Sequence, residues 1–151
     1  MRRKERAMQP DSAWQLLRDA EYGVLCLVDE DAPYGVPVSF ALIGETLYIH
    51  GAIEGRRPDC IRRNSKACFT VIGKTEVSST DFTTAYESVI AEGEIFILRD
   101  TAEIDKGFLA LAQKYNPHMM EQVRDYQGRY AERVLVCRMD IKRISGKANR
   151  R

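Results

Sequence analysis

A short segment that combines glycines with arginines carries the clearest chemical signal in the sequence. It runs from Ile49 to Asn64 and reads IHGAIEGRRPDCIRRN. Residues 54–66 hold five basic and two acidic side chains, a local charge of +3. Pro58 suits the first position of a helix, which places Arg56 and Arg57 at a helix N-terminus. Free backbone N–H groups, the positive end of the helix dipole and two guanidinium groups bind anions together, so the segment predicts a phosphate site.

The same segment has a simpler interpretation, a solvated helix with basic surface residues. Gly51 and Gly55 favour the phosphate site because glycine permits close backbone approach and unusual φ values. His50 stands directly before Gly51 at the end of a predicted strand, and imidazole titrates near neutral pH. A single histidine is more often a packing or hydrogen-bonding residue than a catalytic one, so both roles of His50 stay open.

A second candidate site is a stripe of hydroxyl groups. The side chains of Thr84, Tyr86 and Ser88 fall on one face of a strand, because successive side chains of a strand point to opposite faces. The stripe leads into the apolar pair Val89-Ile90. It is either the solvent face of an edge strand or part of a ligand site.

Other common chemistries find no support in the sequence. The four cysteines, Cys26, Cys60, Cys68 and Cys137, form no C-x-x-C pair and mostly adjoin apolar runs, so we expect structural thiols. The second histidine, His118, follows Asn-Pro and is interpreted as the neighbour of a helix cap. No metal site is predicted, since no third histidine and no matching carboxylate spacing accompany these residues. The sequence also lacks a P-loop, a G-x-G-x-x-G and a G-x-S-x-G motif.

The elements that must position these residues are mainly short strands. An apolar run at 24–28, a run at 34–43 and a third at 46–50 are joined by short turns and predict an antiparallel meander. Pro37 points to a sheet edge or a bulge, because proline cannot donate to the ladder. Further strands are predicted at 67–72, 85–98 and 133–141. One helix is predicted to begin at Pro10, a second to span 101–115 with Thr101 as its N-cap, and a third to span about 118–126. About six strands with flanking helices favour a small barrel, because closure removes sheet edges.

Composition sets the class of protein that carries these elements. The chain has 151 residues, 23 basic and 22 acidic, so its net charge is 23 − 22 = +1. With 44% hydrophobic and 30% charged residues it predicts one globular domain over 1–151, with flexible basic ends at 1–9 and 147–151. Near-neutrality argues against a general nucleic-acid binder. No apolar run approaches the roughly 18 residues of a membrane helix, and no apolar stretch follows the basic N-terminus, so a cytoplasmic protein is expected.

Several segments, in order over roughly residues 12–148, together resemble the pyridoxamine 5′-phosphate oxidase-like flavoproteins, and their nitroimidazole-resistance (NimA-type) branch in particular. The segments that carry this resemblance are EYGVL at 21–25, YGVPVSF at 34–40, LYIHGA at 47–52 with Gly55 and Arg57, GK at 73–74, FTT at 82–84, YESVI at 86–90 with Gly93, and ISGKA at 144–148. Where the family usually has lysine this chain has Arg57, which keeps the charge and adds a bidentate fork.

The resemblance implies a mainly β (α+β), six-stranded antiparallel split β-barrel with flanking helices, which dimerises and binds FMN in a cleft between protomers. Carried over by position, the isoalloxazine and ribityl groups would be lined by one stretch of strand, formed by Val36, Pro37, Val38, Ser39 and Phe40. The segment that would approach the flavin is His50, Gly51 and Ala52, and the phosphate would be held by Arg56 and Arg57. The site would be completed by Tyr86 and Ser88.

The function so implied is an FMN-dependent oxidoreductase that takes hydride from NAD(P)H and reduces a small planar acceptor such as a nitroaromatic. His50 is the candidate catalytic residue, polarising or protonating the acceptor. One alternative is a flavin- or haem-binding storage or sensor protein without turnover. Another is a nucleic-acid-binding barrel that uses the basic ends, disfavoured because aromatic residues are not interleaved with those cations.

Overall fold

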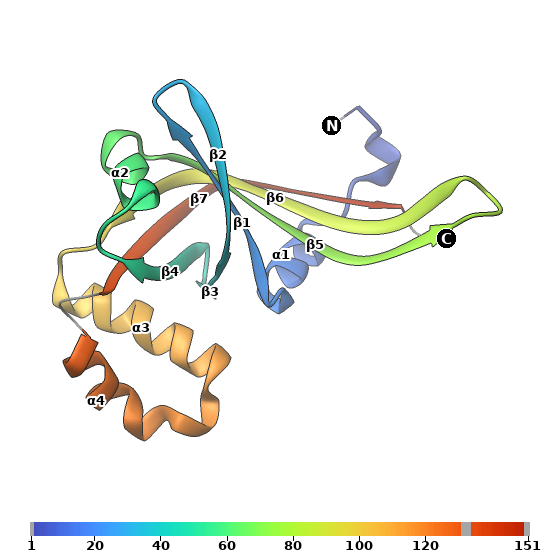
Figure 1. Ribbon diagram of the computed structural model, residues 1–151. Coiled ribbons are helices and arrows are strands. Elements are labelled where there is room, and N and C mark those ends of the chain that lie inside the picture. The colour runs from blue at the N-terminus through green and yellow to red at the C-terminus, as the bar shows by residue number, and fades with distance from the viewer. Residues whose placement is uncertain (1, 131–133, 150–151) are drawn as a thin grey trace.

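The chain folds into a seven-stranded antiparallel sheet with helices on its outside (Figure 1). The computed structural model describes residues 2–130 and 134–149, apart from the side chains at 124, 126, 127, 129 and 130. The strands are β1 Tyr22–Asp29, β2 Ala32–Ser39, β3 Ala41–Ile43, β4 Thr46–Ala52, β5 Lys66–Ser78, β6 Thr83–Ile97 and β7 Val134–Asn149. The helices are α1 Pro10–Asp19, α2 Arg56–Arg63, α3 Thr101–Tyr115 and α4 Met120–Tyr130, with 3-10 turns η1 Lys4–Arg6 and η2 Pro117–Met119.

A break at Phe40 sets the topology of the barrel. The sheet order is β2-β1-β5-β6-β7-β4-β3, so its two edge strands are consecutive in the chain and meet at Phe40. The expectation of one strand over 34–43 within a meander was wrong, because β2 pairs with β1 whereas β3 pairs with β4. The break raises the strand count from the predicted six to seven. The mainly β antiparallel barrel with flanking helices is confirmed, as is the edge position that Pro37 indicated.

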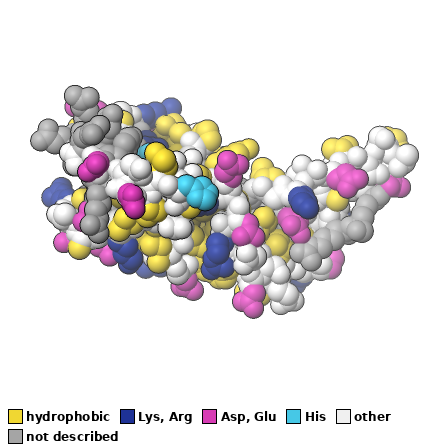
Figure 2. All heavy atoms as spheres, turned by 90° about the horizontal axis from the view of Figure 1, so that it is seen from below, with side chains coloured by type: hydrophobic (Ala, Val, Ile, Leu, Met, Phe, Trp, Pro, Cys, Tyr) yellow, Lys and Arg dark blue, Asp and Glu magenta, His cyan; other side chains and the backbone are white. Residues whose placement is uncertain are grey.

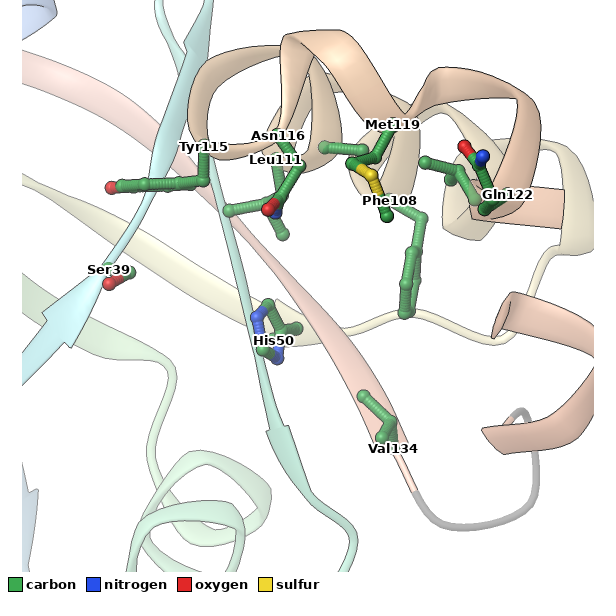
Figure 3. A pocket seen from close by; sticks show the side chains of 11 residues that line it. Ser39, His50, Phe108, Leu111, Tyr115, Asn116, Met119, Gln122 and Val134 are labelled. Atoms are coloured by element: carbon green, nitrogen blue, oxygen red, sulfur yellow. The ribbon is translucent and has the colours of Figure 1, made fainter. Parts of the chain in front are cut away.

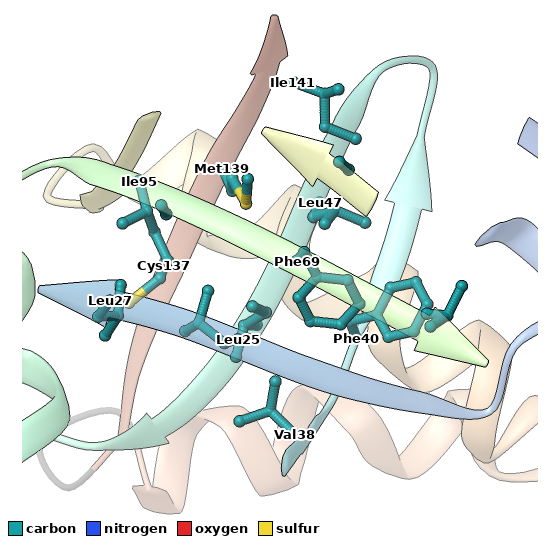
Figure 4. Close-up of a cluster of buried hydrophobic side chains, with 14 of the residues drawn as sticks. Leu25, Leu27, Val38, Phe40, Leu47, Phe69, Ile95, Cys137, Met139 and Ile141 are labelled. Carbon is teal, nitrogen blue, oxygen red and sulfur yellow. The ribbon is translucent and has the colours of Figure 1, made fainter. Parts of the chain in front are cut away.

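The barrel interior is filled by alternate side chains of the strands (Figure 4). Phe40 and Phe69 pack edge to face with ring centroids 4.7 Å apart. On β7 the alternate residues Leu135, Cys137, Met139 and Ile141 are all buried. Burying such a side chain stabilises the fold by about 1.5–3 kcal/mol.

The helix α3 covers one side of the barrel over β4 and β7. It packs closely because Gly107 has no side chain: a Cβ there would come within 2.5 Å of Tyr48 Cδ1. Its N-cap is Asp100, whose carboxylate accepts a hydrogen bond from the Glu103 N–H at 3.0 Å, so the expected Thr101 cap was wrong by one residue. Of the described helices, none is long and apolar enough to cross a membrane.

The strands β5 and β6 form a long hairpin that projects beyond the barrel (Figures 1 and 2). Both strands are longer than the sequence predicted. The C-terminal part of β7 runs beside β6 as far as the pair Tyr86 and Asn149. Ala7 forms a β-bridge with Lys147, so part of each chain end lies against the sheet. Flexibility of the two ends stays a prediction.

Candidate functional site

A pocket of about 500 Å³ lies between the end of β4 and the helices α3 and α4 (Figure 3). Its wall includes Ser39, His50, Phe108, Leu111, Tyr115 and Met119. A mostly apolar cavity with a few polar groups is the usual form of a small-molecule site. Of the residues that the sequence singled out, Ser39 and His50 meet here.

His50 presents its imidazole to this pocket from β4. The ring stacks on Phe108, with centroids 6.1 Å apart and planes inclined by 24°. Part of the His50 side chain is exposed to solvent, and the rest is covered by its neighbours. This partial burial, followed by the positive charge of Arg57, lowers the pKa of His50 below its ordinary value of 6.5. The neutral imidazole is therefore the main form at neutral pH, and it offers one hydrogen-bond donor and one acceptor.

Arg57 lies next to His50 because α2 starts just beyond the end of β4. The helix begins at Arg56 after Gly55, whose φ of 116° favours glycine. Pro58 is consequently the third helical residue and not the first, as the sequence suggested. The guanidinium of Arg57 donates to the His50 carbonyl oxygen at 3.3 Å and lies over Gly51. A Cβ at position 51 would come within 1.3 Å of Arg57 Nη2, so this placement requires glycine.

Arg56 faces away from His50, toward β1 and β2. Its Nε donates to Asp29 at 2.7 Å, and its guanidinium lies 4.3 Å from the centroid of the Tyr34 ring. Arg63 contacts the same carboxylate at 2.5 Å. The hydrogen bond from Arg56 is the largest of the effects that lower the pKa of Asp29. The two arginines that the sequence predicted as partners are therefore divided: Arg56 fixes α2 to the β1–β2 hairpin, and Arg57 stands beside the pocket.

The strand β2 offers a ligand its backbone more than its side chains. Val38 and Phe40 are buried in the barrel and Val36 packs against the core, whereas Pro37 and Ser39 point outward. Among the described strands β2 pairs with β1 alone, so one side of its backbone is a free edge. A planar ligand could hydrogen-bond along that edge.

Tyr115 and Lys114 hold the chain where β2 ends, which sequence reasoning missed. The Tyr115 hydroxyl accepts from the Phe40 N–H at 2.9 Å and lies within hydrogen-bond distance of the carbonyl oxygens of Glu21 and Phe40. Lys114 donates to the Ala20 carbonyl at 2.6 Å and lies 3.8 Å from the centroid of the Phe40 ring. Burial lowers the pKa of Lys114. The only signal was their place in the last turn of a predicted helix.

The remaining predicted residues lie elsewhere in this chain. Tyr86 lines a separate pocket on the projecting hairpin, with Lys147 Nζ 5.6 Å from its ring centroid. Ser88 pairs with Ile72 and Lys147 across the neighbouring strands. Ala52 is exposed at the end of β4. One chain therefore does not bring Tyr86 and Ser88 to the pocket of His50, and their role stays a prediction.

The fold and the site define a small antiparallel β-barrel protein with a ligand-sized pocket under its flanking helices. A family model described as pyridoxamine 5′-phosphate oxidase matches residues 9–148, and the chain belongs to this family. No curated protein matches the sequence significantly.

Solved structures show the same fold at low sequence identity. A candidate 5-nitroimidazole antibiotic resistance protein from Bacteroides thetaiotaomicron superposes with a TM-score of 0.75 at 19% identity, over 93% of this chain and 85% of that one. The flavocytochrome Anf3 from Azotobacter vinelandii gives 0.84 at 20% identity, over 100% and 72%. The FAD- and haem-binding protein from Mycobacterium smegmatis gives 0.82 at 20% identity, over 95% and 72%. The split-barrel expectation is thereby confirmed.

Proposed function

We propose that this protein is an FMN-binding flavoprotein that acts as a homodimer and transfers hydride from NAD(P)H to a small planar acceptor such as a nitroaromatic. Membership of the pyridoxamine 5′-phosphate oxidase family supports a flavin, as do similar structures whose names specify a flavocytochrome and an FAD- and haem-binding protein. The observation that supports a flavin bearing a phosphate, such as FMN, is the guanidinium of Arg57, held over Gly51 beside the pocket.

The residues around Arg57 fit a phosphate group. Arg57 donates to a backbone carbonyl, whereas Arg56 and Arg63 contact Asp29, and Arg62 contacts Asp59. The charge of Arg57 is thus the one best placed to meet a ligand anion. It stands in the first turn of α2, where N–H groups and the helix dipole also favour negative charge. A bidentate guanidinium–phosphate contact is among the stronger charge-assisted hydrogen bonds.

The flavin ring fits the outward side of β2. Its polar edge would meet the free backbone edge of residues 36–39, and Pro37 and Ser39 would contact the ring. Tyr115 fixes the backbone at Phe40, so this edge is held rigidly where the ring would lie. Rigid placement of backbone donors and acceptors reduces the ordering cost of binding.

The bound flavin would supply hydride transfer, so the chain needs no nucleophile of its own. His50 would donate a hydrogen bond to the acceptor, because its lowered pKa keeps the ring neutral and its neighbour Phe108 orients it. The apolar walls formed by α3 and α4 would exclude water and stack against a flat acceptor.

A second copy would complete the site. Tyr86 and Ser88 lie on the long β5–β6 hairpin, away from His50 in the same chain, and this hairpin projects from the barrel far enough to contact another molecule (Figure 1). A homodimer would bring the hairpin of one copy to the pocket of the other. Sedimentation of the purified protein at the mass of one chain would contradict this arrangement.

A non-catalytic cofactor-binding protein is the second candidate. His50 and Met119 line the same apolar pocket, and both residue types serve as axial ligands of haem iron. A Soret band in the purified protein, without NAD(P)H oxidation, would favour this candidate. The proposed oxidoreductase instead predicts that the FMN-loaded protein oxidises NADH or NADPH faster when a nitroaromatic is added. No acceleration with either nucleotide would contradict the hydride-transfer part of the proposal.

A further inference from the structure

Two cysteines that lie far apart in the sequence face each other in the sheet. Cys26 on β1 and Cys68 on β5 are direct partners in the antiparallel ladder, next to the pair Leu25–Phe69. Both point to the outer face of the sheet and are half-buried. Their spacing in the sequence gave no sign of a pair, because the register of β1 against β5 brings them together.

The geometry of this pair suits a disulfide. Directly opposed residues of an antiparallel pair have Cα atoms about 4.5 or 5.5 Å apart, and a disulfide spans Cα separations of about 4.4–6.8 Å. The two side chains leave the same face, so their Cβ atoms point the same way. The two thiols lie close enough to interact, because after burial the charge of Cys68 and a hydrogen bond to it raise the pKa of Cys26, which slows attack by its thiolate without preventing it.

The other two cysteines cannot take part without unfolding. Cys60 on α2 is 0% exposed and Cys137 on β7 is 1% exposed, and both belong to the hydrophobic core. Burial raises the pKa of Cys137 to about 12, which suppresses its thiolate. Cys26 and Cys68 are therefore the two thiols that a reagent in solution can reach.

We propose that Cys26 and Cys68 form a redox-active dithiol that is oxidised to an intramolecular disulfide linking β1 to β5. The oxidant is a low-molecular-weight disulfide. One cysteine thiolate attacks it to form a mixed disulfide and releases one thiolate; the second cysteine then attacks the mixed disulfide and releases the other. The two cysteines lose two electrons and two protons, and the oxidant is reduced to two thiols.

The link would lie close to the strand proposed to hold the flavin, although the inference does not depend on that proposal. Cys26 also pairs with Gly35 on β2, two residues before Pro37. A disulfide would tie β1, the ladder partner of β2, to the centre of the sheet. Cross-linking residues 26 and 68 also restricts the unfolded chain, so the oxidised protein would unfold at a higher temperature.

The test is incubation of the folded protein with glutathione disulfide, followed by acid quenching. Free thiols are then counted in denaturant, and the intact mass and the linked peptides are determined by mass spectrometry. The proposal predicts that thiols fall from the four of the sequence to two, with loss of two hydrogen atoms from the mass and a Cys26–Cys68 cross-linked peptide. Dithiothreitol should restore all four.

Matched variants separate this pair from general thiol oxidation. Cys26→Ser and Cys68→Ser should each end as a stable glutathione adduct, because no second thiol resolves it, while Cys60→Ala should still form the disulfide. Near-ultraviolet and far-ultraviolet circular dichroism would verify that each variant is folded. Four unchanged thiols in the wild-type protein, a stable glutathione adduct on it, or a bridge involving Cys60, Cys137 or a second chain would overturn the proposal.

Discussion

The hydroxyl of Tyr115, in the last turn of α3, contacts both backbone polar groups of Phe40, the residue at which the barrel changes from β2 to β3. Phe40 itself is fully buried, so its N–H has no access to water. One helix side chain thereby fixes the point where the two edges of the sheet meet and where the proposed cofactor strand ends.

Replacing this hydroxyl should destabilise the barrel. In Tyr115→Phe the buried N–H of Phe40 loses its acceptor, which costs about 1–3 kcal/mol. Urea unfolding followed by circular dichroism measures the change in the free energy of unfolding. Tyr22→Phe is the matched control, since Tyr22 is 66% exposed and its change should stay within about 0.5 kcal/mol. Equal losses in both variants would show that the Tyr115 contact does not stabilise the break.

The glycine beneath Arg57 should matter for cofactor binding more than for folding. In Gly51→Ala the new Cβ displaces the guanidinium from its place over residue 51, and only the flexible end of a side chain must move. We expect FMN to bind about 10-fold more weakly, equivalent to about 1.4 kcal/mol, with little change in thermal stability.

Gly128→Ala serves as the control for that substitution. A Cβ at position 128 would meet no atom within 4 Å, and the residue lies in α4, where alanine favours the helix. Its FMN affinity should equal that of the wild-type protein. Unchanged FMN binding in Gly51→Ala, measured by flavin fluorescence, would contradict the placement of the phosphate.

Stability should fall in acid through His50. Because the pKa of His50 is lowered in the folded state, the unfolded chain takes up a proton first as the pH falls below 6.5. The wild-type protein should therefore lose stability from pH 6.5 downward until the folded pKa is passed, and the effect of His50 is absent above pH 6.5.

The variant His50→Gln should remove this part of the pH dependence. Thermal unfolding midpoints of both proteins between about pH 5 and pH 7.5 measure it, the range in which histidine charge changes. His118→Gln, on the exposed turn η2, should keep the wild-type profile. A His50→Gln profile parallel to the wild-type one would show that the imidazole is not held neutral.

Short sequence patterns predicted the features that depend on residues close together in the chain. Pro37 indicated the edge position of β2, and the glycine–arginine order located the start of α2 to within two residues. The break at Phe40 was not predictable in this way. The run from 34 to 43 has continuous strand propensity, and the group that holds the break, Tyr115, is supplied 75 residues later.

The candidate site shows the same division. From the sequence alone Arg56 and Arg57 have the same predicted role. In the fold Arg56 contacts Asp29 at the end of β1, whereas Arg57 contacts the His50 carbonyl oxygen. The facing of Cys26 and Cys68 likewise depends on the register of β1 against β5, which no short-range signal encodes. The features that could not be predicted depend on how segments far apart in the sequence pair with one another, more than on residue type.

The most direct test of the central claim is titration of the purified protein with FMN and with riboflavin, which lacks the phosphate. We predict quenching of FMN fluorescence by the wild-type protein and an FMN affinity about 10- to 100-fold lower in Arg57→Gln, the loss of a charged hydrogen bond of about 1.5–3 kcal/mol. Arg62→Gln, on the same helix but in contact with Asp59, should bind FMN as the wild-type protein does. Riboflavin should bind equally to all three. Absence of FMN binding by the wild-type protein, or an equal loss of FMN and riboflavin in Arg57→Gln, would contradict the account.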